Sequence, residues 1–298
     1  MRAVSPPNNV LAFRSSWRDA GAILGQGLRW AACLTRSKPA KVWLVGAGPG
    51  DPELLTIRAL KLLRSAQAVA YDHLVGDEIL QLISPTAEKI CVGKRAGRHS
   101  MPQHEINARL IELAYRYKRV VRLKGGDPGL FARTGEEISA LAHAGLDYEI
   151  VPGITAALGC AAAAGVPLTE RGIAHSVHFV AGHLCGEGAR EIEWARLADS
   201  SETLVFYMAR AALMHHATKL IEHGLPARMP VMIVRDGTKP SQTIEHLTLA
   251  DCASGFLENF SGAPALVVIG NVVRRAASGA ACGREAGRSR SKHRETAV

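Results

Sequence analysis

The sequence predicts an α/β protein with two domains, a parallel sheet in the first and a mixed sheet in the second. Between Val42 and Pro152, short valine-rich runs alternate with longer segments whose apolar residues recur at helical spacing. This alternation is typical of a parallel sheet covered by helices on both faces. After residue 153 the strand-like runs lie closer together and are joined by tighter turns, which favours a mixed sheet.

The first domain is expected to contain five strands and four helices. The expected strands lie in VWLVGAG (42–48), AVAYD (68–72), KICVG (89–93), VVRLKGGD (120–127) and DYEIVPG (147–153). The expected helices lie in PELLTIRALKLLRSA (52–66), GDEILQLI (76–83), QHEINARLIELAYRY (103–117) and GEEISALAHAG (135–145).

The second domain is expected to open with a helix of small residues, TAALGCAAAAGVP (155–167). Five strands follow it, in SVHFVAGH (176–183), TLVFYM (203–208), PVMIVRDG (230–237), QTIEHL (242–247) and ALVVIG (265–270).

The excess positive charge lies in the two tails. Of the formal net charge of +9, residues 1–40 carry six basic and one acidic residue, and residues 274–298 carry seven and two. The near-neutral stretch between them argues against a nucleic-acid partner, which needs a basic face on the folded domain. Both tails mix Pro, Gly, Ser and Arg without a regular period, so we expect disorder in 1–40 and 276–298. The two domains are expected at 41–153 and 154–275.

Membrane proteins and zinc-binding proteins are both disfavoured. No apolar run is long and uninterrupted enough for a membrane span, and the six scattered cysteines form no C-x-x-C pair. We therefore expect a cytoplasmic protein without a membrane or metal site.

The loop after the first strand begins like a dinucleotide site and then departs from it. Glycine stands at positions 46, 48 and 50, but Asp51 replaces the third glycine of G-x-G-x-x-G. A carboxylate followed by proline at a helix start caps the first turn, where a pyrophosphate would otherwise bind. This pattern disfavours a dinucleotide oxidoreductase.

Other polar loops follow the remaining strands, and the carboxyl ends of parallel strands share one sheet edge. In RLKGGDP, Gly125 and Gly126 permit close approach of a ligand, and Asp127 either accepts hydrogen bonds from that ligand or caps a tight turn. Asp72 and Lys94 form either an acid–base pair or a plain ion pair. Basic residues in these loops, with Arg133 and Arg171 among them, suit a polyanionic small molecule.

These blocks of sequence, in this order, resemble the tetrapyrrole methylase family, and within it the uroporphyrinogen-III C-methyltransferases. The similarity runs from about Val42 to Val273. It implies a homodimer that binds S-adenosyl-L-methionine in the cleft between two α/β domains and releases S-adenosyl-L-homocysteine. The residues that the resemblance places around this cofactor are Pro49, Gly125, Gly126, Asp127, Leu130, Thr155, Ala156, Met208 and Gly237.

The resemblance also implies the reaction, which is methylation of uroporphyrinogen III at C2 and C7 to give precorrin-2 for siroheme, cobalamin or related pathways. It makes Asp72 the proton acceptor and Lys94 the proton donor, with Arg133 as a further candidate for proton handling. It assigns Arg133, Glu136 and Arg171 to the substrate. The sequence departs from the family pattern at His73, Gly129, Ala132, Thr134, Ala163 and Glu170.

Two alternatives stay open within this resemblance. The chain could methylate a later corrinoid precursor, since replacements such as Glu170 make the presumed polycarboxylate site less positive. It could also be a non-catalytic member that binds the cofactor or a tetrapyrrole.

Overall fold

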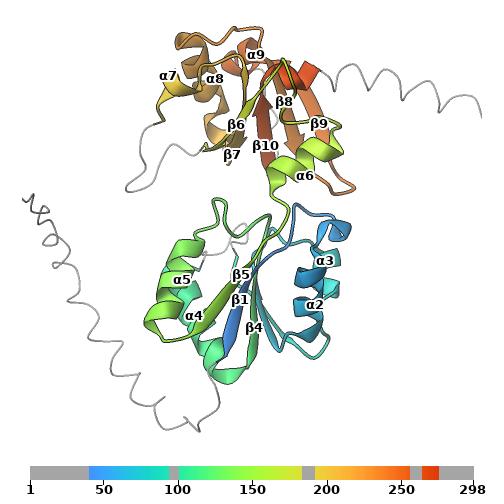
Figure 1. Ribbon diagram of the computed structural model, residues 1–298, viewed down its shortest axis with the longest axis vertical. Coiled ribbons are helices and arrows are strands. Elements are labelled where there is room, and N and C mark those ends of the chain that lie inside the picture. The colour runs from blue at the N-terminus through green and yellow to red at the C-terminus, as the bar shows by residue number, and fades with distance from the viewer. Residues whose placement is uncertain (1–39, 94–100, 183–191, 256–263, 275–298) are drawn as a thin grey trace, which may run out of the picture. The chain divides into compact units, whose positions relative to one another are not determined.

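The computed structural model describes residues 40–93, 101–182, 192–255 and 264–274 (Figure 1). It confirms the predicted fold class: one five-stranded sheet is entirely parallel, and a second five-stranded sheet is mixed. The expected disordered tails and Lys94 lie outside the described residues.

The first sheet is built from the five predicted strands. In the order β3-β2-β4-β1-β5 it comprises β3 (Glu88–Cys91), β2 (Ala68–Tyr71), β4 (Arg119–Lys124), β1 (Lys41–Gly46) and β5 (Asp147–Val151). Figure 1 shows α2 (Ile57–Ser65) and α3 (Asp77–Gln81) on one face, with α4 (Gln103–Arg116) and α5 (Thr134–His143) on the other. This is the three-layer arrangement that alternating strands and helices predict.

The two faces of β4 differ in chemistry. Val121 and Leu123 pack into the apolar cluster beneath α2 and α3, whereas Val120 packs beneath α4 and α5. Arg122 and Lys124 share the face of Val120 because side chains alternate along a strand. Both are only 2% exposed, so the centre of this sheet carries two buried cations.

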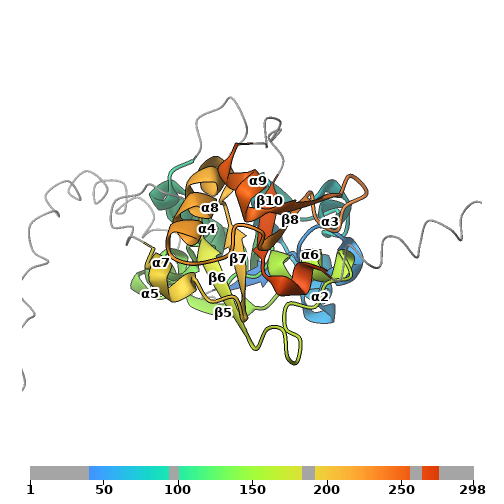
Figure 2. The ribbon, with the colours of Figure 1, turned by 90° about the horizontal axis from the view of Figure 1, so that it is seen from above.

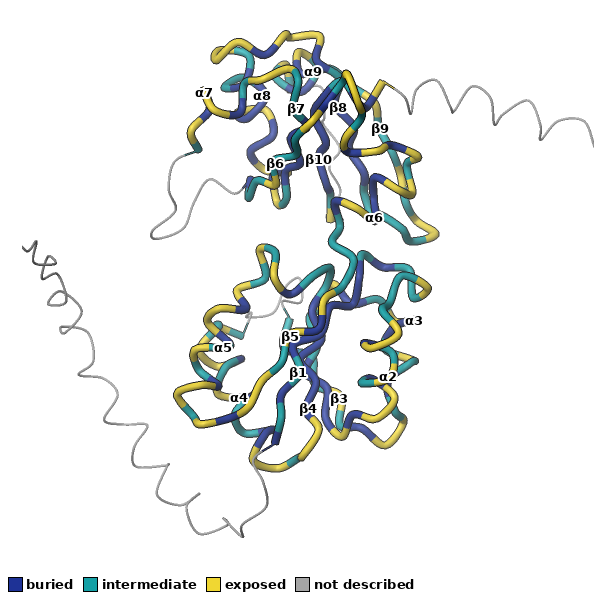
Figure 3. The backbone as a smooth tube through the Cα atoms, viewed as in Figure 1, coloured by how far each residue is buried: buried dark blue, intermediate teal, exposed yellow. Residues whose placement is uncertain are grey.

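The second sheet has the order β6-β7-β10-β8-β9. Only β6 (Ser176–Ala181) and β7 (Glu202–Tyr207) are parallel, while β10 (Ala265–Ile269), β8 (Pro230–Arg235) and β9 (Thr243–Thr248) pair antiparallel. Viewed from above, α6 (Ala156–Ala163) lies across this sheet from α7 (Trp194–Leu197) and α8 (Leu213–Glu222) (Figure 2). In Figure 3 the inner strands of both sheets are mostly buried.

The structure adds helices that the sequence reading did not expect. The turns after the second-domain strands are not uniformly tight, because η4 (Arg210–Ala212) and α8 separate β7 from β8, and α9 (Leu249–Ala253) follows β9. The buried residues Leu213, Ala217 and Leu220 give α8 its apolar face. In the first domain the expected helix 52–66 is divided into η3 (Pro52–Leu54) and α2, which begins after the capping residue Thr56.

Candidate functional site

The loops after β1, β4 and β5 meet through their backbones. Gly48 and Gly126 exchange hydrogen bonds of 3.1 and 2.8 Å. A Cβ added to Gly46 would lie 2.6 Å from the Gly126 carbonyl oxygen, and one added to Gly153 would lie 2.4 Å from the same atom. Glycine is therefore required here for close approach rather than for flexibility alone.

Asp127 ties two of these loops together. Its Oδ1 accepts a 2.7 Å hydrogen bond from the Gly129 N–H, and its Oδ2 accepts one of 2.9 Å from the Gly153 N–H. Asp127 therefore caps a tight turn, which is one of the two roles that the sequence suggested for it. A carboxylate has about four acceptor positions, so Asp127 retains capacity for a ligand donor.

Asp51 performs the capping role expected for it. Its Oδ1 accepts a 2.8 Å hydrogen bond from the Glu53 N–H at the start of η3, with Pro52 in the first position. Its own N–H donates to Thr238 Oγ1 at 3.1 Å, which links the first-domain loop to the loop after β8. Pro49, two residues before Asp51, contacts α6, because a Cβ on Gly159 would lie 2.4 Å from the Pro49 ring.

Tyr207, at the end of β7, organises the start of α6. Its hydroxyl lies 2.7 Å from Thr155 Oγ1 and accepts a 3.0 Å hydrogen bond from the Ala157 N–H. Its ring centroid is 5.1 Å from that of Phe131, in the loop after β4. A Cβ on Gly126 would lie 3.8 Å from the Ala156 nitrogen, so the GGDP loop reaches the same point.

The other predicted cofactor residues surround this junction less tightly. Leu130 is half-buried, and its N–H donates to the Asp127 carbonyl at 3.3 Å. Gly125 packs against Leu74, and Gly237 against α6, where an added Cβ would lie 2.1 Å from Cys160 Sγ. Met208 follows Tyr207 and is 52% exposed, so it is not a core residue.

Left-handed backbone conformations are concentrated in these loops. In the described ranges, the non-glycine residues with positive φ are Phe131, Arg133, Met208, Asp236 and Thr238. Each lies in the loop that follows β4, β7 or β8. Such conformations cost on the order of 1–3 kcal/mol each and are typical of ligand sites.

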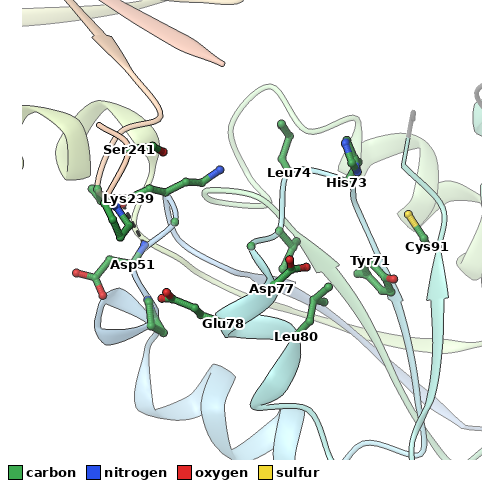
Figure 4. A pocket seen from close by; sticks show the side chains of 16 residues that line it. Asp51, Tyr71, His73, Leu74, Asp77, Glu78, Leu80, Cys91, Lys239 and Ser241 are labelled. Atoms are coloured by element: carbon green, nitrogen blue, oxygen red, sulfur yellow. Dashed lines mark hydrogen bonds between the residues drawn. The ribbon is translucent and has the colours of Figure 1, made fainter. Parts of the chain in front are cut away.

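A pocket of about 890 Å³ adjoins this junction (Figure 4). Figure 4 shows Asp51 and Lys239 at one end and His73 and Cys91 at the other. Its charged lining consists mainly of the acids Asp51, Asp77 and Glu78 together with Lys239. The predicted cofactor residues do not line it, although Gly50 and Thr238 follow two of them directly.

The candidate proton acceptor Asp72 belongs to a buried ionic network. Arg122 Nη2 lies 2.5 Å from Asp72 Oδ1, and Arg122 Nε lies 2.9 Å from Glu137 Oε1. Lys124 Nζ donates to Glu137 Oε2 at 2.7 Å. Burial lowers the pKa of Lys124, and the neighbouring Arg122 charge adds to this effect. Burial alone would also lower the pKa of Arg122, but the charges of Asp72 and Glu137 outweigh it and raise that pKa.

The structure describes the chain beside Asp72 as far as Gly93. Lys94 lies outside the described residues, but Gly93 packs against the Asp72–His73 peptide, since its added Cβ would lie 2.1 Å from the His73 nitrogen. The loops after β2 and β3 therefore touch at Gly93.

Arg133 and Glu136 pair with each other. Arg133 Nε and Nη2 contact the two Glu136 carboxylate oxygens at 2.7 and 2.8 Å. This bidentate contact raises the pKa of Arg133, which is opposite to the shift that proton acceptance by a guanidinium would require. The geometry therefore argues against Arg133 as a proton carrier.

Arg171 is exposed at the tip of a turn closed by Glu170 and Ala174, whose backbones exchange two hydrogen bonds of 2.9 Å. Within the described ranges it forms no ion pair or hydrogen bond with Arg133 or Glu136, so the structure does not assemble the three predicted substrate residues into one contact.

Four residues of this region were not singled out from the sequence: Arg122, Glu137, Tyr207 and Phe131. The available signal for Arg122 was its spacing from Lys124, since these are charged residues at i and i+2 in a central strand and burial obliges them to find partners such as Glu137. One departure from the family pattern is accommodated locally: Thr134 is buried, and its hydroxyl donates to the Pro128 carbonyl at 2.5 Å.

Comparison with known proteins assigns the family. A model described as tetrapyrrole (corrin/porphyrin) methylases matches residues 41–253, which is more than half of the sequence. The chain belongs to the tetrapyrrole methylase family. This confirms the resemblance and agrees with the two-domain fold. In this tetrapyrrole methylase the loops of the two sheets contact each other through Asp51 with Thr238, next to the glycine loops, and Tyr207 holds Thr155 at the start of α6.

Curated relatives of this tetrapyrrole methylase are named siroheme synthase. The protein from Acinetobacter baylyi is 51% identical over 268 residues, covering 90% of this chain and 57% of the relative. The protein from Gluconacetobacter diazotrophicus is 49% identical over 234 residues, covering 78% and 50%. The chain therefore spans about half the length of the curated relatives it matches.

Solved structures show the same fold. Native uroporphyrin-III C-methyltransferase from Thermus thermophilus is 41% identical with a TM-score of 0.69, covering 79% of this chain and 100% of that one. A second structure of that Thermus enzyme, 40% identical with the same TM-score and covering 79% and 94%, is complexed with S-adenosylhomocysteine. A cobalt precorrin-4 methyltransferase is 28% identical with a TM-score of 0.69 and covers 78% and 95%.

Proposed function

We propose that this tetrapyrrole methylase transfers two methyl groups from S-adenosylmethionine to C2 and C7 of uroporphyrinogen III, giving precorrin-2 and S-adenosylhomocysteine. The observation that carries the proposal is the junction of glycine loops at Asp127, Thr155 and Tyr207, which offers backbone groups and one carboxylate. The similarity to the Thermus uroporphyrin-III C-methyltransferase supports the same reaction.

The residues at this junction fit the proposed cofactor. The nine predicted cofactor residues include one carboxylate, Asp127, and no Lys or Arg. S-adenosylmethionine has no phosphate and carries an ammonium and a sulfonium, so an acceptor-rich site without basic side chains suits it. A dinucleotide would need the helix N-terminus that Asp51 already caps.

When bound, the cofactor supplies an electrophilic methyl group. The protein's part is positioning and exclusion of water, because displacement at a methyl group depends on alignment with the attacking carbon. In this proposal Gly125, Gly126 and the 155–156 segment hold the cofactor by backbone contacts, and Met208 covers it. The left-handed conformations at Phe131 and Met208 fix the shapes of the loops that hold and cover the cofactor.

The remaining residues act on the substrate in this proposal. Asp72 accepts the proton released after methylation, and Lys94 donates a proton. Arg133, held by Glu136, and the exposed Arg171 bind substrate carboxylates. The neighbouring pocket does not suit a polycarboxylate, because Asp51, Asp77 and Glu78 line it.

One assay tests the function directly. Purified protein is incubated anaerobically with methyl-labelled S-adenosylmethionine and enzymatically prepared uroporphyrinogen III, and the tetrapyrrole product is analysed by mass spectrometry and NMR. The expected product carries two added methyl groups, at C2 and C7. Methylation only of a later corrinoid precursor would support that alternative, and cofactor binding without any methyl transfer would support the non-catalytic one.

The domain boundaries, the homodimer and the cytoplasmic location remain predictions. Within the described ranges, none of the helices has the length and apolar character of a membrane-spanning segment. Light scattering of the purified chain tests the homodimer, for which a mass of one subunit, 31.8 kDa, would be the contrary result.

A further inference from the structure

Four charged side chains form one connected network between the first sheet and α5. It runs from Asp72 at the end of β2, through Arg122 on β4, to Glu137 on α5, and returns to Lys124 on β4. The side chains of Arg122, Lys124 and Glu137 are 3%, 3% and 0% exposed, whereas that of Asp72 is 28% exposed. The network is therefore buried everywhere except at Asp72.

Stability alone is a poor reason for such a network. Moving charges out of water costs several kcal/mol per ion, and well-packed apolar residues of similar volume often stabilise a core equally well or better. The same face of β4 begins with Val120 in an apolar cluster, so this layer could have continued as an apolar core. On this face of β4, apolar side chains are replaced by charged ones toward the carboxyl end of the strand, where the site is proposed.

Arg122 is fixed in place by its partners. Nε donates to Glu137 at 2.9 Å, Nη1 donates to the Leu123 carbonyl at 3.2 Å, and Nη2 donates to Asp72 Oδ1 at 2.5 Å. With every guanidinium nitrogen engaged, the planar fork has little freedom to rotate. Asp72 Oδ1 is thereby tied to the rigid centre of the sheet.

Glu137 is fixed in turn. Each of its oxygens accepts from one cation, Arg122 or Lys124, and Gln103 of α4 reaches Oε1 at 3.5 Å. Lys124 supplies the second positive charge, so the two carboxylates and two cations balance. No partner of Asp72 Oδ2 occurs among the described residues, which leaves one oxygen of this partly exposed carboxylate available.

We propose that Arg122, held by Glu137, is a positioning residue that orients Asp72 to accept the proton released on methylation. This inference rests on the proposed function. In that reaction a pyrrole carbon forms a bond to the methyl group while the carbon–sulfur bond breaks and its electron pair stays on sulfur. The methylated macrocycle then loses one proton, which Asp72 takes up and later releases to water.

The test is a double-mutant cycle between Arg122 and Asp72. Arg122→Met and Asp72→Asn are assayed singly and together, and Arg119→Met, exposed on the same strand, is the matched control. We expect Arg122→Met to lower kcat about 100-fold, the lower range for loss of acid–base assistance, with KM for both substrates within about threefold. In the Asp72→Asn background the same change should lower kcat less than about threefold.

Two further variants separate positioning from folding. Arg122→Lys keeps the charge but loses the fork, so its kcat should fall between wild type and Arg122→Met. Glu137→Gln leaves the shape and removes one charge, and its kcat loss should also disappear in the Asp72→Asn background. S-adenosylhomocysteine affinity, measured by calorimetry, should be unchanged in all of them.

The outcomes are distinguishable. Arg122→Met and Glu137→Gln could each lower kcat by the same factor in the wild-type and in the Asp72→Asn background. The network would then be only structural, which overturns the inference and leaves the methyltransferase function standing. If Arg122→Met does not fold, the Glu137→Gln cycle decides alone. A wild-type chain that methylates no uroporphyrinogen III removes the proposed function, and this inference with it.

Discussion

The Tyr207 hydroxyl lies 2.7 Å from Thr155 Oγ1 and also accepts a hydrogen bond from the Ala157 N–H. One phenol thus joins the last residue of β7 to the first turn of α6, beside the predicted cofactor residues. Burial raises the pKa of Tyr207, so the phenol stays protonated at neutral pH.

Removing this hydroxyl should loosen the start of α6. Tyr207→Phe leaves the Ala157 N–H without its partner, which is expected to cost about 1–2 kcal/mol in the free energy of unfolding. S-adenosylhomocysteine affinity should fall several-fold. Urea unfolding and calorimetry measure these quantities, with the exposed Tyr148→Phe as a control that should change neither. Unchanged affinity in Tyr207→Phe would contradict a role for this contact in the site.

Replacing Asp127 should affect the cofactor more than the substrate. Asp127→Ala removes the acceptors of the Gly129 and Gly153 N–H groups, so the GGDP and VPG loops separate. We expect S-adenosylhomocysteine affinity to fall at least tenfold, a loss of about 1.4 kcal/mol. Asp127→Asn keeps one acceptor oxygen and should lose less. An Asp127→Ala protein with wild-type affinity for S-adenosylhomocysteine would contradict the assignment of Asp127 to the cofactor.

The reverse pattern is expected at Arg171. Arg171→Ala removes an exposed cation without disturbing any described contact, so the cofactor affinity should stay near wild type. If Arg171 binds a substrate carboxylate, KM for the tetrapyrrole should rise about tenfold. Steady-state kinetics with calorimetry separate the two effects, and equal losses in both would show that Arg171 does not act on the substrate alone.

A steric prediction concerns Gly237 and Cys160. A Cβ at Gly237 would lie 2.1 Å from Cys160 Sγ but 3.4 Å from its Cβ. Gly237→Ala should therefore cost about 1–3 kcal/mol through overpacking. Adding Cys160→Ala removes the clashing sulfur and should restore most of the lost stability, although Cys160→Ala alone is destabilising. Additive losses in the double variant, measured by urea unfolding, would refute this packing.

Cys160 also gives a pH dependence with a definite sign. Burial raises the pKa of its thiol to about 11 from 9.0. The folded state then retains a proton that the unfolded state has lost, so the contribution is full below pH 9 and disappears as pH rises through 11. The stability advantage of wild type over Cys160→Ala should shrink by about 2 kcal/mol between pH 8 and 10.5. A difference that stays constant over this range would contradict it.

The strands and most helices could be read from the sequence because their signals are local. Valine-rich runs and i, i+3, i+4 spacing predicted the ten strands of the described residues, and α4, α5 and α6, close to their observed bounds. The helix α8 was overlooked because His216 interrupts its apolar face, yet His216 is completely buried and its ring lies 2.7 Å from the Gly182 carbonyl.

The site was predictable where it depends on backbone and on single capping residues, and less so where it depends on partners far apart in sequence. Asp51 capped its turn as expected because the partner, Glu53, is two residues away. The contact of Asp72 with Arg122 spans fifty positions, and that of Thr155 with Tyr207 spans fifty-two. A periodic pattern contains no information about such pairs, so only the fold reveals them.

The left-handed residues after β4, β7 and β8 have a consequence for recognition. Their loops adopt costly torsion angles while the chain folds, before any small molecule arrives. A small molecule that binds there meets loops whose conformation is already fixed, so these loops lose little conformational entropy on association. Met208→Gly would relieve the torsional cost at an exposed residue, yet it would let this loop fluctuate, so a more stable protein would bind a small molecule there more weakly.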